Sequence, residues 1–314
     1  MTWVKKGLIF NTLSNQAWNV SHAQVPTTIK LNSNTWRIFY STRNKDNQSS
    51  ISFFDVAAGN PKKIVYTHGQ PILSSGELGS FDDSGVMPSS IVYHKKKFFL
   101  YYTGWTKRVT VPYSNGIGLA ISSDCLTFEK YSKGPIFYPH LDDPFFIGTA
   151  SVCLQNNEWE CWYASCTGWE RFGDQVEPLY HLKYAYSKNG INWERPNITA
   201  IDYSNENEGG IVRAAFNQNE SPKKIWFSAR GKNDYRKNIA NSYRIYSATQ
   251  NSKHTWVRSS TPDIDVSQNG WDSEMVAYPN IIEHEGVLYM FYNGNGFGAS
   301  GIGYATQNLD NLCQ

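Results

Sequence analysis

The sequence predicts an all-β fold, a five-bladed β-propeller with four-stranded blades, and the prediction rests first on a fivefold internal repeat. Each repeat contains one anchor residue at an equivalent position: Pro26, Pro88, Ala150, Ala214 and Pro279. The anchors are separated by 62 (88 − 26), 62 (150 − 88), 64 (214 − 150) and 65 (279 − 214) residues. A nearly constant period is typical of repeat architectures, and we call the repeats units 1 to 5.

An aromatic strand shortly after each anchor is the second observation. These strands span residues 36–40, 98–102, 159–163, 225–227 and 288–292. Further short alternating segments follow, such as "GIGLAISSDCLTFEKYSKGPIF" in unit 2. Alternating strands separated by Asn, Gly, Asp and Ser read as hairpins, and the run "HKKKFF" reads as a hairpin turn. We therefore expect four strands in each unit, with neighbouring blades covering both faces of the aromatic strands.

Closure of the ring is the third observation. Unit 5 ends in "SGIGYATQNLDNLCQ", which has room for a third strand but not for a fourth. The N-terminal stretch "TWVKKGLIF" matches "TFEKYSKGPIF" of unit 2. We therefore expect residues 3–10 to form the outer strand of the last blade, which removes an open sheet edge. Residues 1–314 would then form a single propeller domain.

Composition indicates a folded protein without a strongly charged surface. The 314 residues are 40% hydrophobic and 18% charged, with a formal net charge of +2. This balance argues against a disordered chain and against a nucleic-acid-binding surface. No run approaches the ~18 apolar residues of a membrane span, and no signal-peptide pattern is present. We expect a cytoplasmic protein without membrane insertion, and the oligomeric state stays open.

Several other chemistries are disfavoured by the absence of their motifs. The sequence has no zinc-ligand spacing, no nucleophile elbow, no Walker loop and no dinucleotide-binding fingerprint. We therefore expect no metal site and no cofactor, although a cation at the centre of the ring stays open.

Acidic residues gather in the segments that precede the anchors. In a propeller these segments enter the innermost strands and converge on one mouth, so their side chains are candidates for one site. Asp83 and Glu274 lie five residues before their anchors (88 − 83 and 279 − 274) and are the leading catalytic candidates. Asp143, Glu208 and Asp272 are the reserves. The alternative is that these residues serve only the turns before the strands, which Asp and Gly favour for backbone reasons.

A second set of residues would bind substrate around the same mouth. The candidates are His22, Gln24, Arg43, Trp105, Trp169, Arg213, Arg230 and Tyr278. Aromatic faces suit sugar rings, and guanidinium groups suit carboxylate or phosphate groups. Packing between blades is the alternative for Trp105 and Trp169. An arginine inside an inner strand needs a partner, so we expect Arg213 to pair with a ligand or a pocket acid.

The chain resembles the five-bladed propeller glycosidases of families 32, 43, 68 and 130, through the five blades and motifs such as "KYAYSKNGINW". More closely, "DDSGVMPSSIV", "FLYYTGW", "GWDSEMVAYP" and "MFYNGNGFG" resemble an uncharacterised glycosidase-like group often encoded beside bacterial surface-polysaccharide genes. The family's catalytic acids do not carry over residue by residue. Val25, Met87, Gly148 and Val212 occupy or adjoin those positions here.

The leading hypothesis is an enzyme that acts on a glycosidic or sugar-phosphate bond, in the metabolism of bacterial surface polysaccharides. Its ligand would be a carbohydrate or a nucleotide sugar. Hydrolysis needs one protonated carboxyl group and one carboxylate, and we expect inversion, with Glu274 as the acid and Asp83 as the base. The alternatives are a sugar-binding propeller without catalysis, and a phosphorylase or glycosyl transferase on the same scaffold.

Overall fold

The computed structural model describes residues 2–12, 16–217 and 223–309, and within them the protein is nearly all β. Its regular elements are the strands β1 to β20, one turn of 3-10 helix, η1 (Ile239–Asn241), and one short helix, α1 (Asn295–Gly298). The all-β prediction is therefore confirmed. No helix in the described part of the chain is long and apolar enough to cross a membrane.

Units 1 to 4 each fold as four strands that pair in the order of the chain. Unit 1 contains β2 (Ser21–Asn32), β3 (Thr35–Arg43), β4 (Ser49–Ala57) and β5 (Asn60–Thr67). Unit 2 contains β6 (Gly85–His94), β7 (Lys97–Lys107), β8 (Tyr113–Ser122) and β9 (Glu129–Lys130). Unit 3 contains β10 (Ile147–Gln155), β11 (Glu158–Phe172), β12 (Gln175–Ser187) and β13 (Trp193–Ile201). Unit 4 contains β14 (Glu208–Ala215), β15 (Lys224–Gly231), β16 (Arg244–Ser252) and β17 (Thr255–Arg258).

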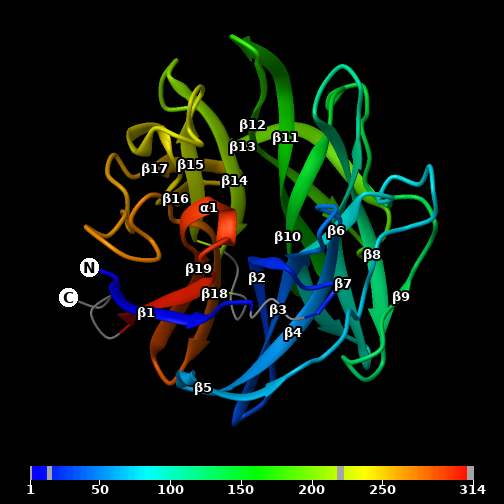
Figure 1. Ribbon diagram of the computed structural model, residues 1–314, viewed down its shortest axis with the longest axis vertical. Coiled ribbons are helices and arrows are strands. Elements are labelled where there is room, and N and C mark those ends of the chain that lie inside the picture. The colour runs from blue at the N-terminus through cyan, green and yellow to red at the C-terminus, as the bar shows by residue number, and fades with distance from the viewer. Residues whose placement is uncertain (1, 13–15, 218–222, 310–314) are drawn as a thin grey trace.

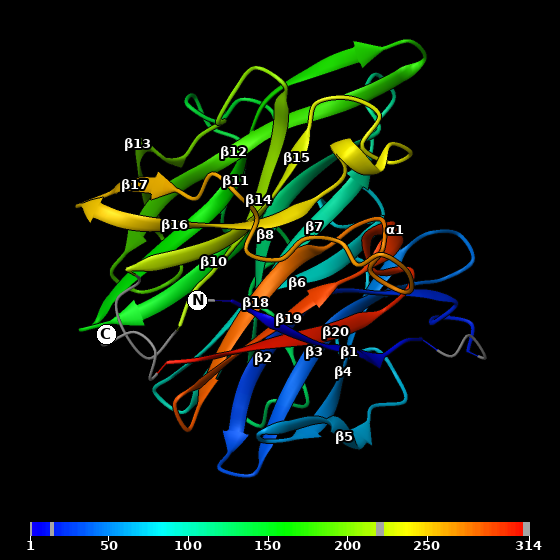
Figure 2. The ribbon, with the colours of Figure 1, turned by 90° about the vertical axis from the view of Figure 1, so that its left-hand side faces the viewer.

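Unit 5 takes its fourth strand from the other end of the chain. It contains β18 (Ala277–His284), β19 (Val287–Asn293) and β20 (Ile302–Asn308), and β1 (Val4–Phe10) pairs antiparallel with β20. Figure 2 shows β1, in blue, beside β20, in red. Trp3 is buried next to β1 and meets the ring of Trp226 edge-on, with 5.6 Å between the ring centroids. The predicted closing strand is confirmed.

Two-residue turns join the first and second strands of several units. Lys95 and Lys96 both have positive φ angles, 47° and 62°, and close the β6–β7 hairpin. Asn156 and Asn157 do the same between β10 and β11, with φ angles of 51° and 64°. Two successive left-handed residues match the twist of a tight hairpin. The run of lysines is thus a hairpin turn, as predicted.

The first strands of the five units surround a common centre. They contact one another in a closed cycle, β2 with β6, β6 with β10, β10 with β14, β14 with β18, and β18 with β2. Figure 1 shows the units following one another from blue to red around this centre, with β5, β9 and β17 toward the periphery. Single parallel bridges, Ser49 with Gly85 and Tyr180 with Gly210, link neighbouring units.

Aromatic side chains of the second strands pack between neighbouring units. Trp36 of β3 is fully buried and lies edge-on to Tyr289 of β19, at 4.9 Å between ring centroids. Phe99 of β7 packs on Trp159 of β11 at 5.4 Å. Each buried ring removes a large apolar area from water, at about 25 cal/mol for every Å². These contacts hold adjacent sheets face to face.

Candidate functional site

Every first strand has a break in its register at the same place. The breaks lie between Gln24 and Thr27, Pro88 and Ser90, Gly148 and Ser151, Val212 and Ala215, and Ala277 and Asn280. Four residues at these breaks have positive φ angles: Val25 (54°), Thr149 (44°), Arg213 (61°) and Tyr278 (57°). None of them is glycine. Bulges of this kind re-aim side chains, and non-glycine residues in the left-handed region inside a strand, outside any hairpin turn, often lie at functional sites.

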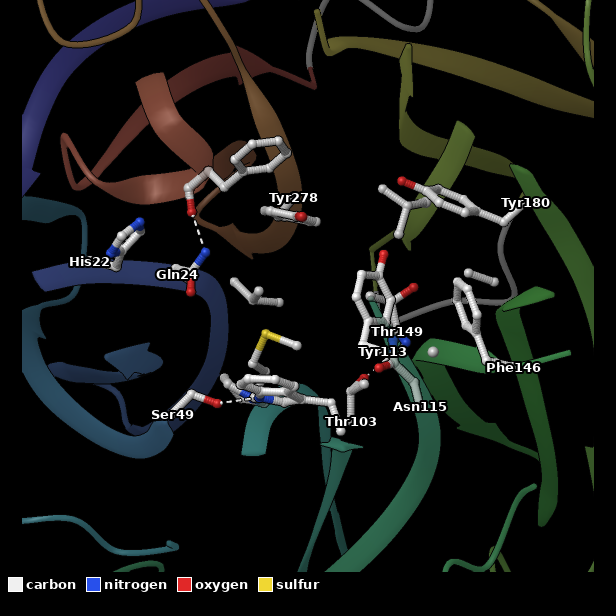
Figure 3. A pocket seen from close by; sticks show the side chains of 18 of the residues that line it. His22, Gln24, Ser49, Thr103, Tyr113, Asn115, Phe146, Thr149, Tyr180 and Tyr278 are labelled. Carbon is white, nitrogen blue, oxygen red and sulfur yellow. Dashed lines mark hydrogen bonds between the residues drawn. The ribbon is translucent and has the colours of Figure 1, made fainter. Parts of the chain in front are cut away.

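A cavity of about 410 Å³ lies at this level and takes residues from all five units. Aromatic rings form much of its wall: Trp105, Tyr113, Phe146, Tyr180, Tyr235, Tyr243, Tyr278 and Phe297. Figure 3 shows His22 and Gln24 on one side, Tyr180 and Phe146 on the other, and Tyr278 between them. The segment before each anchor supplies at least one lining residue, for example Gln24, Met87, Gly148, Val212 and Tyr278.

Five of the eight predicted substrate-binding residues line this cavity, namely His22, Gln24, Arg43, Trp105 and Tyr278. The structure does not bring Trp169, Arg213 or Arg230 into the lining. Trp169 packs behind the wall, 5.4 Å from the ring of Tyr113 and 5.6 Å from that of Phe146. Trp169 therefore packs between neighbouring units, which is the alternative to substrate binding given above.

The unit 1 side of the cavity is a hydrogen-bonded cluster. Gln24 donates from Nε2 to the carbonyl oxygen of Phe297 at 2.7 Å and accepts from Nε of Arg43 at 3.0 Å. Nδ1 of His22 lies 2.8 Å from the hydroxyl of Ser21. Burial and the charge of Arg43 lower the pKa of His22 to about 4. His22 is therefore neutral at pH 7.

Arg230 supports the aromatic wall from behind. Its guanidinium carbon lies 3.7 Å from the ring centroid of Tyr235 and 4.9 Å from that of Tyr180. Its nitrogens donate to the carbonyl oxygen of Pro178 at 2.6 Å and to the hydroxyl of Tyr180 at 3.2 Å. The hydroxyls of Tyr180 and Tyr243 are hydrogen-bonded to each other. Burial raises the pKa of Tyr243 well above its ordinary value, so this phenol stays protonated and neutral.

Arg236 enters the cavity from the loop that follows β15. Glu177 accepts from its Nε at 3.0 Å and from its Nη2 at 3.2 Å. The hydroxyl of Tyr235 donates to the same carboxylate at 2.5 Å. The carboxylate of Glu177 is buried and offsets the charge of Arg236.

Arg213 lies one residue beyond the lining residue Val212 and ties the first strands together. Its side chain is 1% exposed. Nη2 donates to the carbonyl oxygen of Pro26 and to the hydroxyl of Thr27, both at 2.9 Å, and Nη1 donates to the carbonyl oxygen of Ser89. Nε lies 3.4 Å from the carbonyl oxygen of Pro279. Burial lowers the pKa of Arg213 to about 9, which leaves it charged at neutral pH.

The predicted catalytic carboxylates do not appear among the described residues that line the cavity. Glu208 accepts from Arg258 at 2.6 and 2.7 Å. Asp83 is half-buried and accepts from the backbone nitrogen of Gly79 at 3.1 Å. Glu274 is exposed. The catalytic roles of these residues stay predictions.

Three buried aspartates before the first strands share one set of partners. Each accepts from a tyrosine 20 residues later on the second strand and pairs with a lysine of the third or fourth strand. The sets are Asp82 with Tyr102 and Lys130, Asp143 with Tyr163 and Lys183, and Asp272 with Tyr292 and Lys5. The salt-bridge distances are 2.7, 2.9 and 2.8 Å in that order. These acids fasten the strands of one unit to one another, which is the reason they turn away from the cavity.

A cation site is not apparent in the described residues. They contain no group of three or more histidine, cysteine, aspartate or glutamate side chains that could hold a metal ion.

Comparisons with known proteins place the chain in a family. It shares 36% identity over 308 residues with the uncharacterized protein Rv1502 of Mycobacterium tuberculosis strain H37Rv, and equally with MT1551 of strain CDC 1551. The match covers 97% of this chain and 99% of each mycobacterial protein. The chain belongs to the Rv1502 family. No family model matches it.

Solved structures show which fold the Rv1502 family shares. The chain superposes on a glycosyl hydrolase from Bacteroides ovatus with a TM-score of 0.73 and 14% identity, over 99% of this chain and 94% of that protein. A second glycoside hydrolase gives 0.71 and 17%, over 96% and 92%. The β-1,2-mannobiose phosphorylase from Listeria innocua, in complex with β-1,2-mannobiose, gives 0.71 and 11%, over 99% and 98%. The chain thus has the scaffold of propeller glycosidases and related phosphorylases.

Sequence reasoning missed several lining residues. Tyr113 and Asn115 lie at the start of β8, Tyr180 lies within β12, and Tyr243 directly precedes β16. All four lie directly before a third strand or in its first half. A search of the segments entering the third strands, in addition to those before the anchors, would have found them.

Proposed function

We propose that the protein binds and processes a saccharide in the central cavity, and that its five units are the blades of a single five-bladed propeller. The cavity carries the proposal, because it combines aromatic rings, hydrogen-bonding side chains and guanidinium groups from all five units. Its volume of about 410 Å³ lies within the range of small-molecule sites, roughly 300–1,000 Å³.

The physical basis is complementarity between the cavity wall and a sugar. Trp105 donates from Nε1 to the hydroxyl of Ser49 at 2.8 Å, which fixes the plane of the indole ring at the cavity edge. A fixed aromatic face packs on the apolar face of a sugar ring. Gln24, Asn115 and Thr149 supply polar groups around it, and a few placed polar groups determine orientation in such sites.

The reaction we favour breaks a glycosidic or sugar-phosphate bond, in the metabolism of bacterial surface polysaccharides. Support comes from the shared scaffold, since the superposed structures include a glycosyl hydrolase and a phosphorylase. Such a reaction needs an acid and a base within reach of the bond. Asp83 and Glu274 could serve only if their loops bring them to the cavity when a saccharide binds, because neither lines it now.

A second candidate is saccharide binding without turnover. It is favoured by one observation, namely that no carboxylate lines the cavity within the described part of the chain. Carboxylate pairs perform most glycoside hydrolysis, so a cavity without them suits recognition better than catalysis.

One experiment separates the two candidates. The protein is incubated with a panel of oligosaccharides, aryl glycosides and nucleotide sugars, with and without inorganic phosphate. NMR spectra of the mixtures report both binding, by saturation transfer, and turnover. Turnover supports the enzyme, phosphate-dependent turnover makes it a phosphorylase, and binding alone supports the second candidate. Absence of binding to every member would overturn the proposal.

Variants test the roles of single residues in the same assay. Trp105→Ala should weaken saccharide binding about tenfold or more, because a stacked aromatic contact is lost. Asp83→Asn and Glu274→Gln test the predicted catalytic pair, for which loss of a proton transfer costs ~10²–10⁴-fold in turnover. If both variants turn over substrate like the wild type, the pair is excluded.

A further inference from the structure

Cationic groups without an acidic partner surround the central cavity. Arg43 lines it, Arg213 lies directly beyond it, and Arg230 lies behind its aromatic wall. Within the described residues, none of the three forms a salt bridge with a carboxylate. Of the acids that precede the first strands, Asp82, Asp143 and Asp272 pair with lysines and Glu208 pairs with Arg258. Among the described residues, the charged side chains that line the cavity are arginines, and no carboxylate lines it.

Only one of these three arginines has terminal nitrogens without an acceptor in the described part of the chain. The donors of Arg213 are taken by oxygens of three neighbouring first strands. Those of Arg230 are taken by the carbonyl oxygens of Pro178 and Gly231 and by Tyr180. Arg43, in contrast, donates only from Nε, to Gln24. Within the described residues its two terminal nitrogens have no acceptor, although Arg43 lines the cavity.

A second guanidinium group acts on the same space. Burial lowers the pKa of Arg43, and the positive charge of Arg236 lowers it further. Arg236 also lines the cavity, and it is held by Glu177 in a fixed orientation. His22, beside Arg43, is neutral and adds no competing charge to the site.

We propose that the bound saccharide carries an anionic group, a carboxylate or a phosphate, and that Arg43 binds this group while Arg236 faces it across the cavity. The inference rests on the proposed function and names the class of saccharide. A guanidinium fork matches the two oxygens of such groups, and hydrogen bonds between charged partners are about twice as strong as neutral ones. Placement in a partly buried cavity strengthens the attraction further, since solvent screens it less.

Matched pairs of sugars test the proposal directly. Dissociation constants are measured by titration for glucuronic acid against glucose, galacturonic acid against galactose, and mannose 1-phosphate against mannose, with inorganic phosphate alone as a further arm. In at least one pair the charged member should bind about 10- to 100-fold more tightly, the range that hydrogen bonds to a charged group provide. The pairs distinguish a carboxylate from a sugar phosphate, and the phosphate arm identifies a free anion.

Three variants link the preference to Arg43. Arg43→Gln should remove it, so that the charged and the neutral member of a pair bind this variant with similar affinity. Arg43→Lys keeps the charge and should retain part of the preference, which guards against a loss due to misfolding. Arg171→Gln, at an exposed position of β11, should bind like the wild type.

The possible results separate this inference from the proposed function. Binding of the neutral sugars without preference for the charged ones overturns the inference but leaves the saccharide cavity in place. A preference that survives in Arg43→Gln also overturns it. If no sugar of any pair binds, the inference fails, and the panel of oligosaccharides, aryl glycosides and nucleotide sugars decides the proposed function separately.

Discussion

Replacement of Asp143 by asparagine should destabilise the fold strongly, because the carboxylate is the centre of a buried ionic cluster. Asp143 is 1% exposed. It accepts from Ser165 at 2.6 Å and from Tyr163 at 3.0 Å, and it pairs with Lys183 at 2.9 Å and Arg195 at 3.3 Å. Lys183 is itself buried. Removal of one partner from such a pair leaves an uncompensated charge, which typically costs 3–5 kcal/mol.

We therefore expect Asp143→Asn to lose about 3–5 kcal/mol of unfolding free energy at pH 7, measured by urea denaturation. The matched control is Asp142→Asn, a change of the neighbouring but exposed carboxylate, which should stay within about 0.5 kcal/mol of the wild type. The double variant Asp143→Asn/Lys183→Met should recover part of the loss, since the buried ammonium group is gone and only Arg195 is left without its carboxylate. A single variant as stable as the wild type would refute the reasoning.

The difference in unfolding free energy between the wild type and Asp143→Asn should depend on pH, because Asp143 has a shifted pKa. Burial alone would raise this pKa, but the bonds from Ser165 and Lys183 outweigh it and hold the pKa below its usual value. A carboxyl with a lowered pKa stabilises the folded state above its unfolded pKa of about 3.9 and loses that contribution as the pH falls through the folded pKa. The gap between wild type and Asp143→Asn should therefore be constant from pH 7 to 5 and shrink below pH 4.

Three further predictions test other parts of the structure. Arg213→Met should lower the unfolding free energy by about 2 kcal/mol, because oxygens on three first strands lose their hydrogen-bond donor. The exposed control Arg171→Met should leave the unfolding free energy unchanged. An unchanged value for Arg213→Met would mean that removal of the buried charge stabilises the fold by an equal amount. Deletion of residues 1–10 should lower the melting temperature through loss of β1, and an unaltered melting temperature would contradict its role in closing unit 5. The imidazole NMR signal of His22, assigned with His22→Gln, should not titrate between pH 8 and 5.5; a midpoint near 6.5 would contradict its neutral state.

The repeat made most of the fold predictable. Second strands such as 98–102 are apolar at every position, because neighbouring units cover both of their faces, and that signal survives in the sequence. The closing strand was predictable for a related reason: "TWVKKGLIF" keeps the pattern of the outer strands although it stands at the other end of the chain.

The direction of side chains at the site was much less predictable. Asp143 and Asp272 precede the first strands as expected, but they turn toward lysines of their own units, which lie far from them in sequence. The left-handed backbone at Thr149 and Tyr278 occurs at the breaks in strand register, and no residue type in the sequence predicts it. Tyr180 and Tyr243 reach the cavity from the third-strand side, which a search for acidic clusters does not examine.

The pairing of β1 with β20 has a consequence for how the protein is made. The two strands are separated by 292 residues (302 − 10), so β1 is synthesised roughly 15–60 s before its partner at about 5–20 residues per second. During that interval its backbone groups lack the neighbour they have in the finished ring. Lys5 and Lys6 lie within β1, and lysines on a free strand edge discourage pairing with other chains. Unit 5 can gain its outer strand only after β20 has been synthesised, and until then these two charges disfavour pairing of β1 with other chains.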